Sequence, residues 1–549
     1  MYLLITSSKG KSDKIYRSAK IVESYKTSEG KSRQRIIQSL GPVKTEEDEN
    51  RFQEIVKNMK KGKEFIDINS MIFKFSKSYG IYYTVTQLFE KYGIDTVLKS
   101  NLKKGKHEFD IYSIIQALIV NRLENPLSKN KAFDYIQKDY PQEIDCKKED
   151  LYHAMDFLEK QKENIELEIF QNLKIKLNLN LEHAHYDITS SYFEGHNCEI
   201  ATYGYNRDGL KGKEQIVIGL VLVDNIPIYH EVFEGNTSDK TTVLDIFTTL
   251  KIKFNLEKPT LVGDRGMFTK DIIQTLEEKE EKYILGFSKV GNQITEEVLQ
   301  KGISLPKEKE NCNAILGKVE EVKYSDKNIQ KRKYILCIDK NTQKEQLETL
   351  EKIKDYISLK LNELYTKYKK SQLSKTGTKM SWESFIKQVD KIITRNRRLY
   401  NINFEHNNQK FTFELNKEWY KREQKAAGKF VLITNGNKSP LDVLKTYKEL
   451  NDVEMSFNII KNQLDLRPIN HYKTQRVKAH VFICILALLI EKIMAKSLNG
   501  ISPQTALDEL KRLKLGSFQI GKIIKNQLTE ISCEQKEILN QINIIQPKI

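Results

Sequence analysis

Closely spaced cysteines are missing from this sequence. The six cysteines lie far apart, and no two of them form a Cys-x-x-Cys pair: Cys146, Cys198, Cys312, Cys337, Cys484 and Cys533. Structural zinc sites and disulfide frameworks are built from regularly spaced cysteines, so the pattern argues against both. Scattered cysteines are typical of a reducing compartment, and we expect a cytoplasmic protein.

Long apolar runs and two common catalytic signatures are also absent. The stretch Met1–Thr6 is too short for the core of a signal peptide. The longest apolar run, Val481–Ile490, falls well short of the roughly 20 residues that a membrane-spanning helix needs, so it predicts a buried helix and no membrane partner. Neither a Gly-x-x-x-x-Gly-Lys-Ser/Thr loop nor a Ser-His-Asp order offers a competing chemistry.

Positive charge, in contrast, is abundant. The 549 residues carry a formal net charge of +17, and the pI is near 9.1. With 23 Phe and 26 Tyr, the chain has enough core material to fold into about two to four domains. A surface this basic predicts a polyanionic partner, nucleic acid rather than membrane, and a basic surface without a partner is the alternative.

Two modules precede the strand-rich part of the chain. Residues 1–65 contain two alternating stretches, Ala19–Tyr25 and Arg33–Leu40, which predict a hairpin, and then a helix capped by Thr45. Residues 80–178 have a helical pattern and predict a DNA-binding or dimerisation domain. The hairpin is basic, and these residues either contact phosphates or face solvent: Lys20, Lys26, Lys31, Arg33 and Arg35.

From residue 181 onward the pattern changes to strands. Residues 181–288 predict three consecutive strands, a helix, a strand, a helix and a strand. This order matches a ribonuclease-H-like arrangement, in which the first and fourth strands are neighbours. Asp187 lies in the first strand and Asp264 ends the fourth, so the two carboxylates should be adjacent. We therefore predict an α/β fold with a ribonuclease-H-like catalytic domain, a mixed sheet with flanking helices.

Two glycines bracket Asp264 in the sequence. Gly263 and Gly266 allow a tight turn and leave room for a large ligand to approach the carboxylate. The alternative is a turn in which Asp264 only caps the following helix. The local sequence favours neither reading.

A large insertion is expected after these strands. Residues 289–428 interrupt the pattern with a long charged helix and basic clusters. The catalytic domain resumes over residues 429–500, starting with the strand 429–435. Residues 501–549 are polar and predict a helical tail.

The helix that begins near residue 440 carries a third acid. Tyr447, Glu454 and Lys461 are seven residues apart, so they should line one helical face. An apolar stripe runs beside them: Val453, Phe457, Ile460 and Leu464. The helix can thus pack on the sheet and direct Glu454 towards the other two acids, although an exposed Glu–Lys strip is the alternative. Three carboxylates suit two Mg²⁺ or Mn²⁺ ions about 3.5–4 Å apart acting on a phosphodiester.

Together these motifs resemble the DDE transposases of bacterial insertion sequences. The group that is most similar places its last acid in a Tyr-x-x-Arg-x-x-x-Glu-x-x-x-x-x-x-Lys signature. The likeness covers most of the chain, including its start and residues 466–482. It is carried by four motifs: Tyr186-Asp187, Gly235–Asp239, Gly263–Phe268 and Tyr447…Glu454…Lys461.

The resemblance implies a function and a set of roles. Asp187, Asp264 and Glu454 would bind two Mg²⁺ or Mn²⁺ ions. A metal-activated water would nick the transposon end, and the freed 3′-hydroxyl would attack a second phosphodiester. Double-stranded DNA, at the transposon ends and the target, is the implied partner, bound by a homodimer in the bacterial nucleoid.

Further DNA contacts are implied for Tyr447, Lys461 and Arg265. In this family the insertion presents a Trp to a flipped base, and Trp419 matches that role, although it could equally be a core residue. One position departs from the signature: Leu450 stands where the family has Arg. This weakens the expected DNA contact of that helix and puts hairpin-forming chemistry in doubt.

Two other functions share part of this pattern. A ribonuclease-H-like nuclease or resolvase would use the same acids but would have little use for the insertion and the N-terminal modules. A non-catalytic DNA-binding protein derived from a transposase would keep the charge and the fold without turnover.

Overall fold

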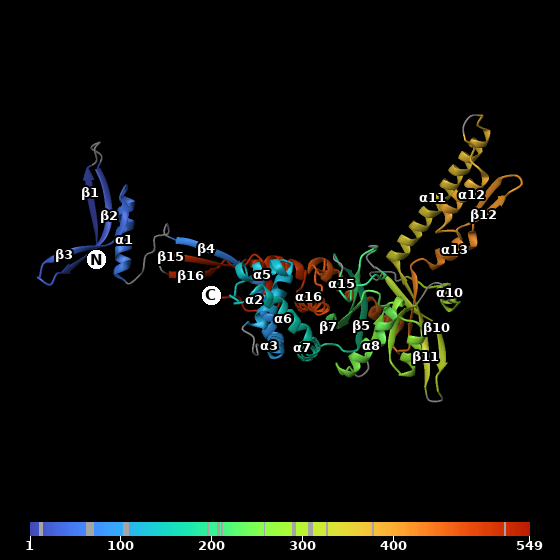
Figure 1. Cartoon of the computed structure of the whole chain (residues 1–549), viewed down its shortest axis with the longest axis horizontal. Helices are drawn as coiled ribbons and strands as arrows, with labels where there is room; N and C mark the ends of the chain where they lie inside the picture. Colours follow the sequence, from blue (N-terminus) through green and yellow to red (C-terminus); the bar gives the residue numbers. More distant parts are fainter. Residues whose placement is uncertain are drawn as a thin grey trace. The chain divides into compact units, whose positions relative to one another are not determined.

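The chain divides into two compact units, each described here by itself (Figure 1). The first comprises residues 1–77, 514–530 and 548–549, and the second comprises residues 78–513 and 531–547. The computed structural model describes residues 1–9, 15–61, 71–102, 109–194, 197–205, 209, 212–256, 259–287, 293–305, 311–325, 328–375, 378–520 and 523–548.

The start of the first unit is a small sheet with one helix. Strands β1 (Tyr2–Lys9), β2 (Ile15–Lys26) and β3 (Ser32–Pro42) pair antiparallel in sequence order. Helix α1 (Glu46–Lys60) begins with a capping box in which Thr45 accepts from the Asp48 backbone. The predicted hairpin and capped helix are confirmed, and β1 was not predicted.

A second three-stranded sheet belongs to the same unit. Its order is β16 (Ile523–Leu528), β15 (Lys514–Ile520) and β4 (Met71–Ser78). The rings of Phe73 and Phe518 meet edge to face, 5.3 Å apart. The prediction of a helical tail is therefore wrong for residues 514–528, because β15 and β16 form a local hairpin and β15 also pairs with the distant strand β4. Helices α17 (Pro503–Leu510) and α18 (Cys533–Gln541) do form in the tail.

An eight-stranded mixed sheet is the centre of the second unit. Its order is β10-β11-β14-β9-β8-β5-β6-β7. The predicted neighbours are confirmed: β5 is parallel to β8 and antiparallel to β6. The strands are β5 (His183–Tyr192), β6 (Gln215–Val223), β7 (Ile226–Glu234), β8 (Thr260–Gly263), β9 (Tyr283–Phe287), β10 (Cys312–Lys323), β11 (Ile329–Asp339) and β14 (Lys429–Thr434).

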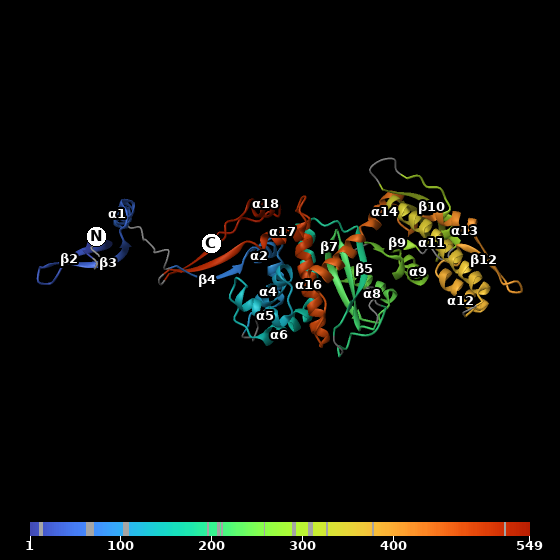
Figure 2. The same cartoon turned by 90° about the horizontal axis from the view of Figure 1, so that it is seen from above.

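Helices cover this sheet and connect its strands. α8 (Asp239–Ile252) precedes β8, and α9 (Lys270–Glu278) follows it. α16 (Thr474–Ala495) packs on β7 on one side and on α4 and α6 on the other (Figure 2). The run 481–490 within it is buried, as predicted. The helical layer beyond comprises α2 (Gly80–Tyr92), α3 (Ile94–Asn101), α4 (Ile111–Glu124), α5 (Lys129–Lys138), α6 (Lys148–Lys160) and α7 (Lys162–Lys176).

None of the helices in the described ranges is long and apolar enough to span a bilayer. The buried α16 is apolar because it lies between other helices and the sheet, not because it faces lipid.

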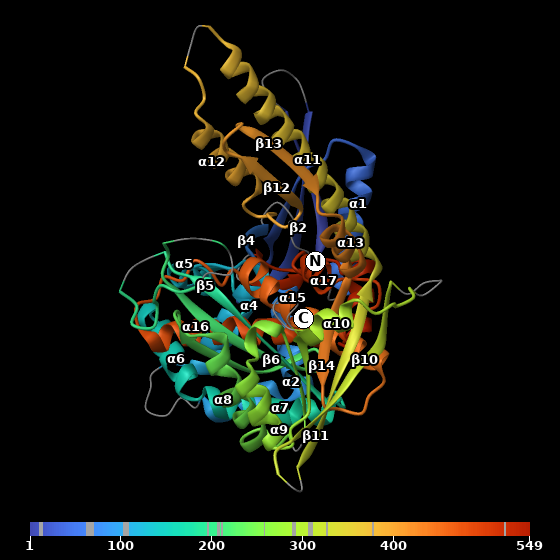
Figure 3. The ribbon, with the colours of Figure 1, turned by 90° about the vertical axis from the view of Figure 1, so that its right-hand side faces the viewer.

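Residues 289–428 contribute in two ways. After α10 (Gln293–Leu299), the β10–β11 hairpin adds two strands to the central sheet, where β11 pairs with β14. The remainder projects from the sheet around a core of its own, which includes Leu361, Phe385 and Phe411 (Figure 3). Its elements are α11 (Lys340–Leu373), α12 (Trp382–Ile393), β12 (Tyr400–Glu405), β13 (Lys410–Leu415) and α13 (Lys417–Ala426).

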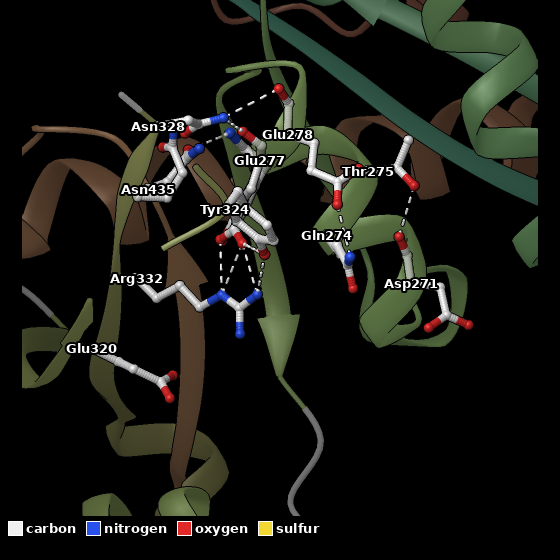
Figure 4. Close-up of polar contacts among 12 residues, drawn as sticks. Asp271, Gln274, Thr275, Glu277, Glu278, Glu320, Tyr324, Asn328, Arg332 and Asn435 are labelled. Carbon is white, nitrogen blue, oxygen red and sulfur yellow. Dashed lines mark hydrogen bonds and ion pairs between the residues drawn. The ribbon is translucent and has the colours of Figure 1, made fainter. Parts of the chain in front are cut away.

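A buried carboxylate holds the hairpin against α9 (Figure 4). Glu277 is fully buried and accepts from Arg332 Nη2 at 2.7 Å and from the hydroxyls of Tyr283 and Tyr324 at 2.5 Å each. Burial alone would raise the pKa of Glu277, but the hydrogen bonds from Arg332 and the two tyrosines outweigh it and lower that pKa. The ionised form is therefore part of the folded state.

We expect Glu277→Gln to destabilise the protein by roughly 1.5–3 kcal/mol, because Arg332 loses a charged partner. Because the folded pKa of Glu277 lies below its unfolded value of 4.5, its carboxylate stabilises the fold at pH values above 4.5. This stabilisation is lost as the pH falls through the folded pKa. The difference in unfolding free energy between wild type and Glu277→Gln should therefore become smaller at acidic pH. Urea unfolding at neutral and acidic pH measures it. Glu278→Gln, one residue along and exposed, is the control. Equal stability of the two variants would contradict the assigned role.

Candidate functional site

The pairing of β5 with β8 places two of the predicted acids side by side. Their parallel register runs from His183↔Thr260 to His185↔Val262. Continued by two residues, it sets Asp187 opposite Asp264. The backbone of Asp264 is extended, with φ −79° and ψ 157°, so the strand direction persists there.

Both acids lie on the sheet face that carries α14 (Pro440–Lys448). His185 and Asp187 are two residues apart on β5 and so share a face. On that face, His185 Nε2 donates to the Thr446 carbonyl at 3.0 Å. The Tyr447 hydroxyl donates to Asp264 Oδ1 at 3.1 Å. Tyr447 thus contacts a predicted metal ligand directly, which the sequence did not suggest.

The predicted continuous helix through Tyr447, Glu454 and Lys461 is wrong. α14 ends at Lys448, α15 runs from Asn451 to Asn458, and a π-helical turn follows over Ile459–Gln463. Glu454 is exposed and Lys461 is buried, so the three residues do not line one face. The break covers Glu449 and the buried Leu450, which is the N-cap residue of α15. The predicted apolar stripe is confirmed as buried: Val453, Phe457, Ile460 and Leu464.

The structure also explains the unusual residue of the signature. Leu450 is 5% exposed and packs in the main core, so an Arg at this position would be buried. Lys448, the nearest cation in the sequence, does not replace it. Its Nζ contacts Asp339 Oδ2 at 3.0 Å and Cys312 Sγ at 2.5 Å. These contacts tie α14 to the base of the insertion.

The glycine next to Asp264 makes room for a residue of this chain. A Cβ added to Gly263 would lie 2.5 Å from the Phe268 ring, so that ring fills the space that we expected a ligand to use. A Cβ at Gly266 would meet nothing within 4 Å. The sequence showed the need for glycine at residue 263 but not the group that causes it.

Two other predicted residues are not brought to these acids. Trp419 is half-buried against the separate core of the insertion and lines a hollow there with Arg398 and Arg422. Trp419 thus packs partly in the core of the insertion, as the alternative prediction stated. The side chain of Arg265 lies outside the described residues, and its backbone forms part of a short 3₁₀ turn, Arg265–Met267.

The donor set at the sheet edge is made of oxygen atoms, which suits a hard divalent cation. In the described part of the chain, however, no three His, Cys, Asp or Glu side chains form a group that could hold a metal. The carboxylate oxygens of Asp187 and Asp264 suit a divalent ion by their chemistry, and Glu454 is not gathered with them in this structure.

Comparisons with known families decide the class of the protein. Residues 3–69 match a model described as the N-terminal domain of IS1634 family transposases, and residues 195–490 match the transposase DDE domain. The second match spans more than half of the 549 residues. The chain belongs to the DDE transposases. It acts on DNA, and its reaction is DNA cleavage and strand transfer.

The DDE match contains Asp264 and Glu454 and begins after Asp187. Among solved structures, the chain is similar to a piggyBac transposase in a synaptic complex with hairpin DNA. The identity is 9%, each chain is covered over 78% and the TM-score is 0.32. No curated protein matches the chain.

We expect Tyr447→Phe to slow DNA cleavage by the transposase roughly 10-fold, because Asp264 loses the hydroxyl that orients it. A divalent-ion titration of cleavage should show a raised half-saturating concentration. Tyr356→Phe, an exposed tyrosine on α11, is the matched control. A wild-type ion dependence in Tyr447→Phe would exclude a role at the carboxylate.

Proposed function

We propose that Asp187, Asp264 and Glu454 are the catalytic carboxylates of this transposase and that they act in a ribonuclease-H-like domain. The observation that carries this proposal is the parallel pairing of β5 with β8, which sets Asp187 opposite Asp264. The strand order β7-β6-β5-β8-β9 supports the fold. Glu454, exposed on the first turn of α15, supplies the third carboxylate.

Two divalent ions, Mg²⁺ or Mn²⁺, would supply activation of the attacking oxygen and stabilisation of the leaving oxygen. The protein itself positions the carboxylates. The strand register holds two like charges close together, and the Tyr447 hydroxyl fixes one of them by hydrogen bonding. Such a pair repels itself and therefore favours a cation between its members.

The substrate is double-stranded DNA at the ends of the insertion sequence, and a homodimer is the proposed assembly. Cations on the N-terminal hairpin support a DNA contact. Arg35 pairs with Glu23 at 2.5 Å, and Lys31 pairs with Glu29 at 3.4 Å, both at exposed positions. Surface pairs of this kind are worth about 0–1 kcal/mol, so phosphate oxygens can replace the carboxylates. Lys26 and Arg33 are exposed beside them.

We expect Asp264→Asn to reduce cleavage and strand transfer by more than about 100-fold, because a ligand of the metal is lost. DNA binding in the absence of metal should stay within about twofold of wild type, since the overall fold and basic surface are unchanged. Cleavage of a labelled duplex that carries the element end, with Mg²⁺ or Mn²⁺, is the measurement.

Asp271→Asn, an exposed aspartate on the following helix α9, is the control and should cleave normally. Normal cleavage by Asp264→Asn would overturn the proposed metal site. Wild-type protein that binds element ends but never cuts them would instead indicate a DNA-binding derivative without activity.

A further inference from the structure

A hollow of about 480 Å³ lies in the second unit, apart from the proposed catalytic carboxylates. Two segments distant in sequence form the two walls and most of the lining, together with Tyr152 of α6: residues 122–130, from α4 to the start of α5, and residues 465–480, which lead into α16. The second wall includes most of residues 466–482, a segment whose sequence resembles the transposases. The proposed catalytic site gives this segment no role. The hollow is rich in cations.

Arg122, on α4 in the first wall, is one of two buried basic residues that line the hollow. It is 3% exposed. Its Nη1 donates to the carbonyls of Leu464 at 3.3 Å and Asp465 at 3.0 Å, and its Nη2 donates to the Leu127 carbonyl at 3.0 Å. Its Nε is buried and, among the described residues, has no hydrogen-bond partner. The guanidinium is thus held by neutral groups, with one donor unused.

Lys129 is the second buried cation, 5% exposed at the first position of α5. Its Nζ lies 3.4 Å from His480 Nδ1. His480 donates through Nε2 to the Leu466 carbonyl at 2.9 Å, so Nδ1 is free to accept from the lysine. Burial keeps the pKa of His480 well below its ordinary value, and the histidine is neutral. Burial and the nearby Arg122 likewise lower the pKa of Lys129.

These two cations have no anionic partner in the described part of the chain. Asp465 lines the hollow but is exposed, and its recorded contact with Arg122 is through the backbone carbonyl. Asp156 is already engaged by Arg476, which donates to its two carboxylate oxygens at 3.0 Å each. Burial beside Arg122 without a counter-charge is what lowers the pKa of Lys129, and a bound anion would reverse that cost and favour the protonated lysine, so the hollow favours an anion.

Two helix N-termini add to this preference. α5 begins at Lys129 and α16 at Thr474, and neither has a hydrogen bond from its N-cap side chain, Ser128 or Lys473. Both N-cap residues line the hollow. Unpaired backbone N–H groups and the positive end of the helix dipole bind phosphate-type anions.

The position of the hollow indicates where the anion comes from. Phe193, which follows β5 beyond Asp187, forms a parallel bridge with Ile469 in the second wall. The mouth is open to solvent, since Asn130, Tyr472 and Lys473 are exposed. A DNA strand that leaves the catalytic face could therefore place a backbone phosphate in the hollow.

We propose that this hollow binds a phosphate group of the DNA backbone, through Arg122, Lys129 and the N-termini of α5 and α16. The proposal rests on the proposed function for its DNA substrate. It adds a phosphate contact outside the carboxylate site, which positions the strand and takes no part in the chemistry.

The test is DNA binding by the full-length protein without metal, measured by fluorescence anisotropy of a duplex over a range of salt concentrations. Each lost phosphate contact lowers the slope of log affinity against log salt by about 1. We expect that loss for Lys129→Met, together with several-fold weaker binding. Lys138→Met, at the exposed far end of the same helix, should leave the slope unchanged.

A second variant and a second probe keep the proposal falsifiable. Lys473→Gln changes an exposed residue at the mouth and should also lower the slope, whether or not Lys129→Met folds. Inorganic phosphate, tested by thermal unfolding, separates the two sources of the anion. If phosphate raises the Tm of wild type but not of Lys129→Met while both DNA slopes stay unchanged, the site takes free phosphate and the DNA proposal is overturned.

A lower Tm of Lys129→Met with unchanged DNA slopes in both variants would assign Lys129 a purely structural role and also overturn it. Because the binding assay uses no metal and scores no cleavage, its failure would leave the proposed carboxylates untested rather than refuted. Conversely, normal cleavage by Asp264→Asn would refute the proposed catalytic role of the carboxylates. It would not affect the measured salt dependence of DNA binding.

Discussion

The parallel pairing of β5 with β8 is the constraint on which the proposed catalytic site depends. Backbone pairing from His183↔Thr260 to His185↔Val262 sets the register, and its continuation by two residues leads to Asp187 and Asp264. The intervening β6–β7 hairpin lies on the other side of β5, and α8 provides the crossover that parallel strands require. Carboxylates on neighbouring strands suit a divalent cation, which is the ion proposed for this site.

The insertion is bound to this centre through polar contacts at its base. Glu277 on α9 and Arg332 on β11 join the helix after Asp264 to the added hairpin. Lys448, at the end of the helix that carries Tyr447, pairs with Asp339, the residue that caps α11. These contacts join α9 and α14 to the base of the insertion, and one of them engages Lys448, the cation nearest in sequence to Leu450.

Charges of opposite sign are separated within the second unit. Carboxylates lie at the end of β8 and on α15, whereas the buried cations Arg122 and Lys129 lie in a hollow whose second wall is joined to the end of β5. DNA phosphates and divalent ions carry the complementary charges. A strand with metal at one point and a phosphate in the hollow would satisfy both groups at once, since each is costly to leave unpaired.

The sequence by itself determined the strands around Asp187 and Asp264, their neighbouring order, the buried run 481–490 and the capped helix after Thr45, because periodicity, turns and caps are local. It failed where distant partners decide. Residues 514–528 form a hairpin that the distant strand β4 extends into a sheet. The predicted helix is divided at residues 449–450, where Leu450 is buried in the core, and Tyr447 contacts Asp264 while Lys461 is buried. The basic hollow joins residues more than three hundred positions apart, such as Arg122 and Asp465, and only their packing removes its cations from water.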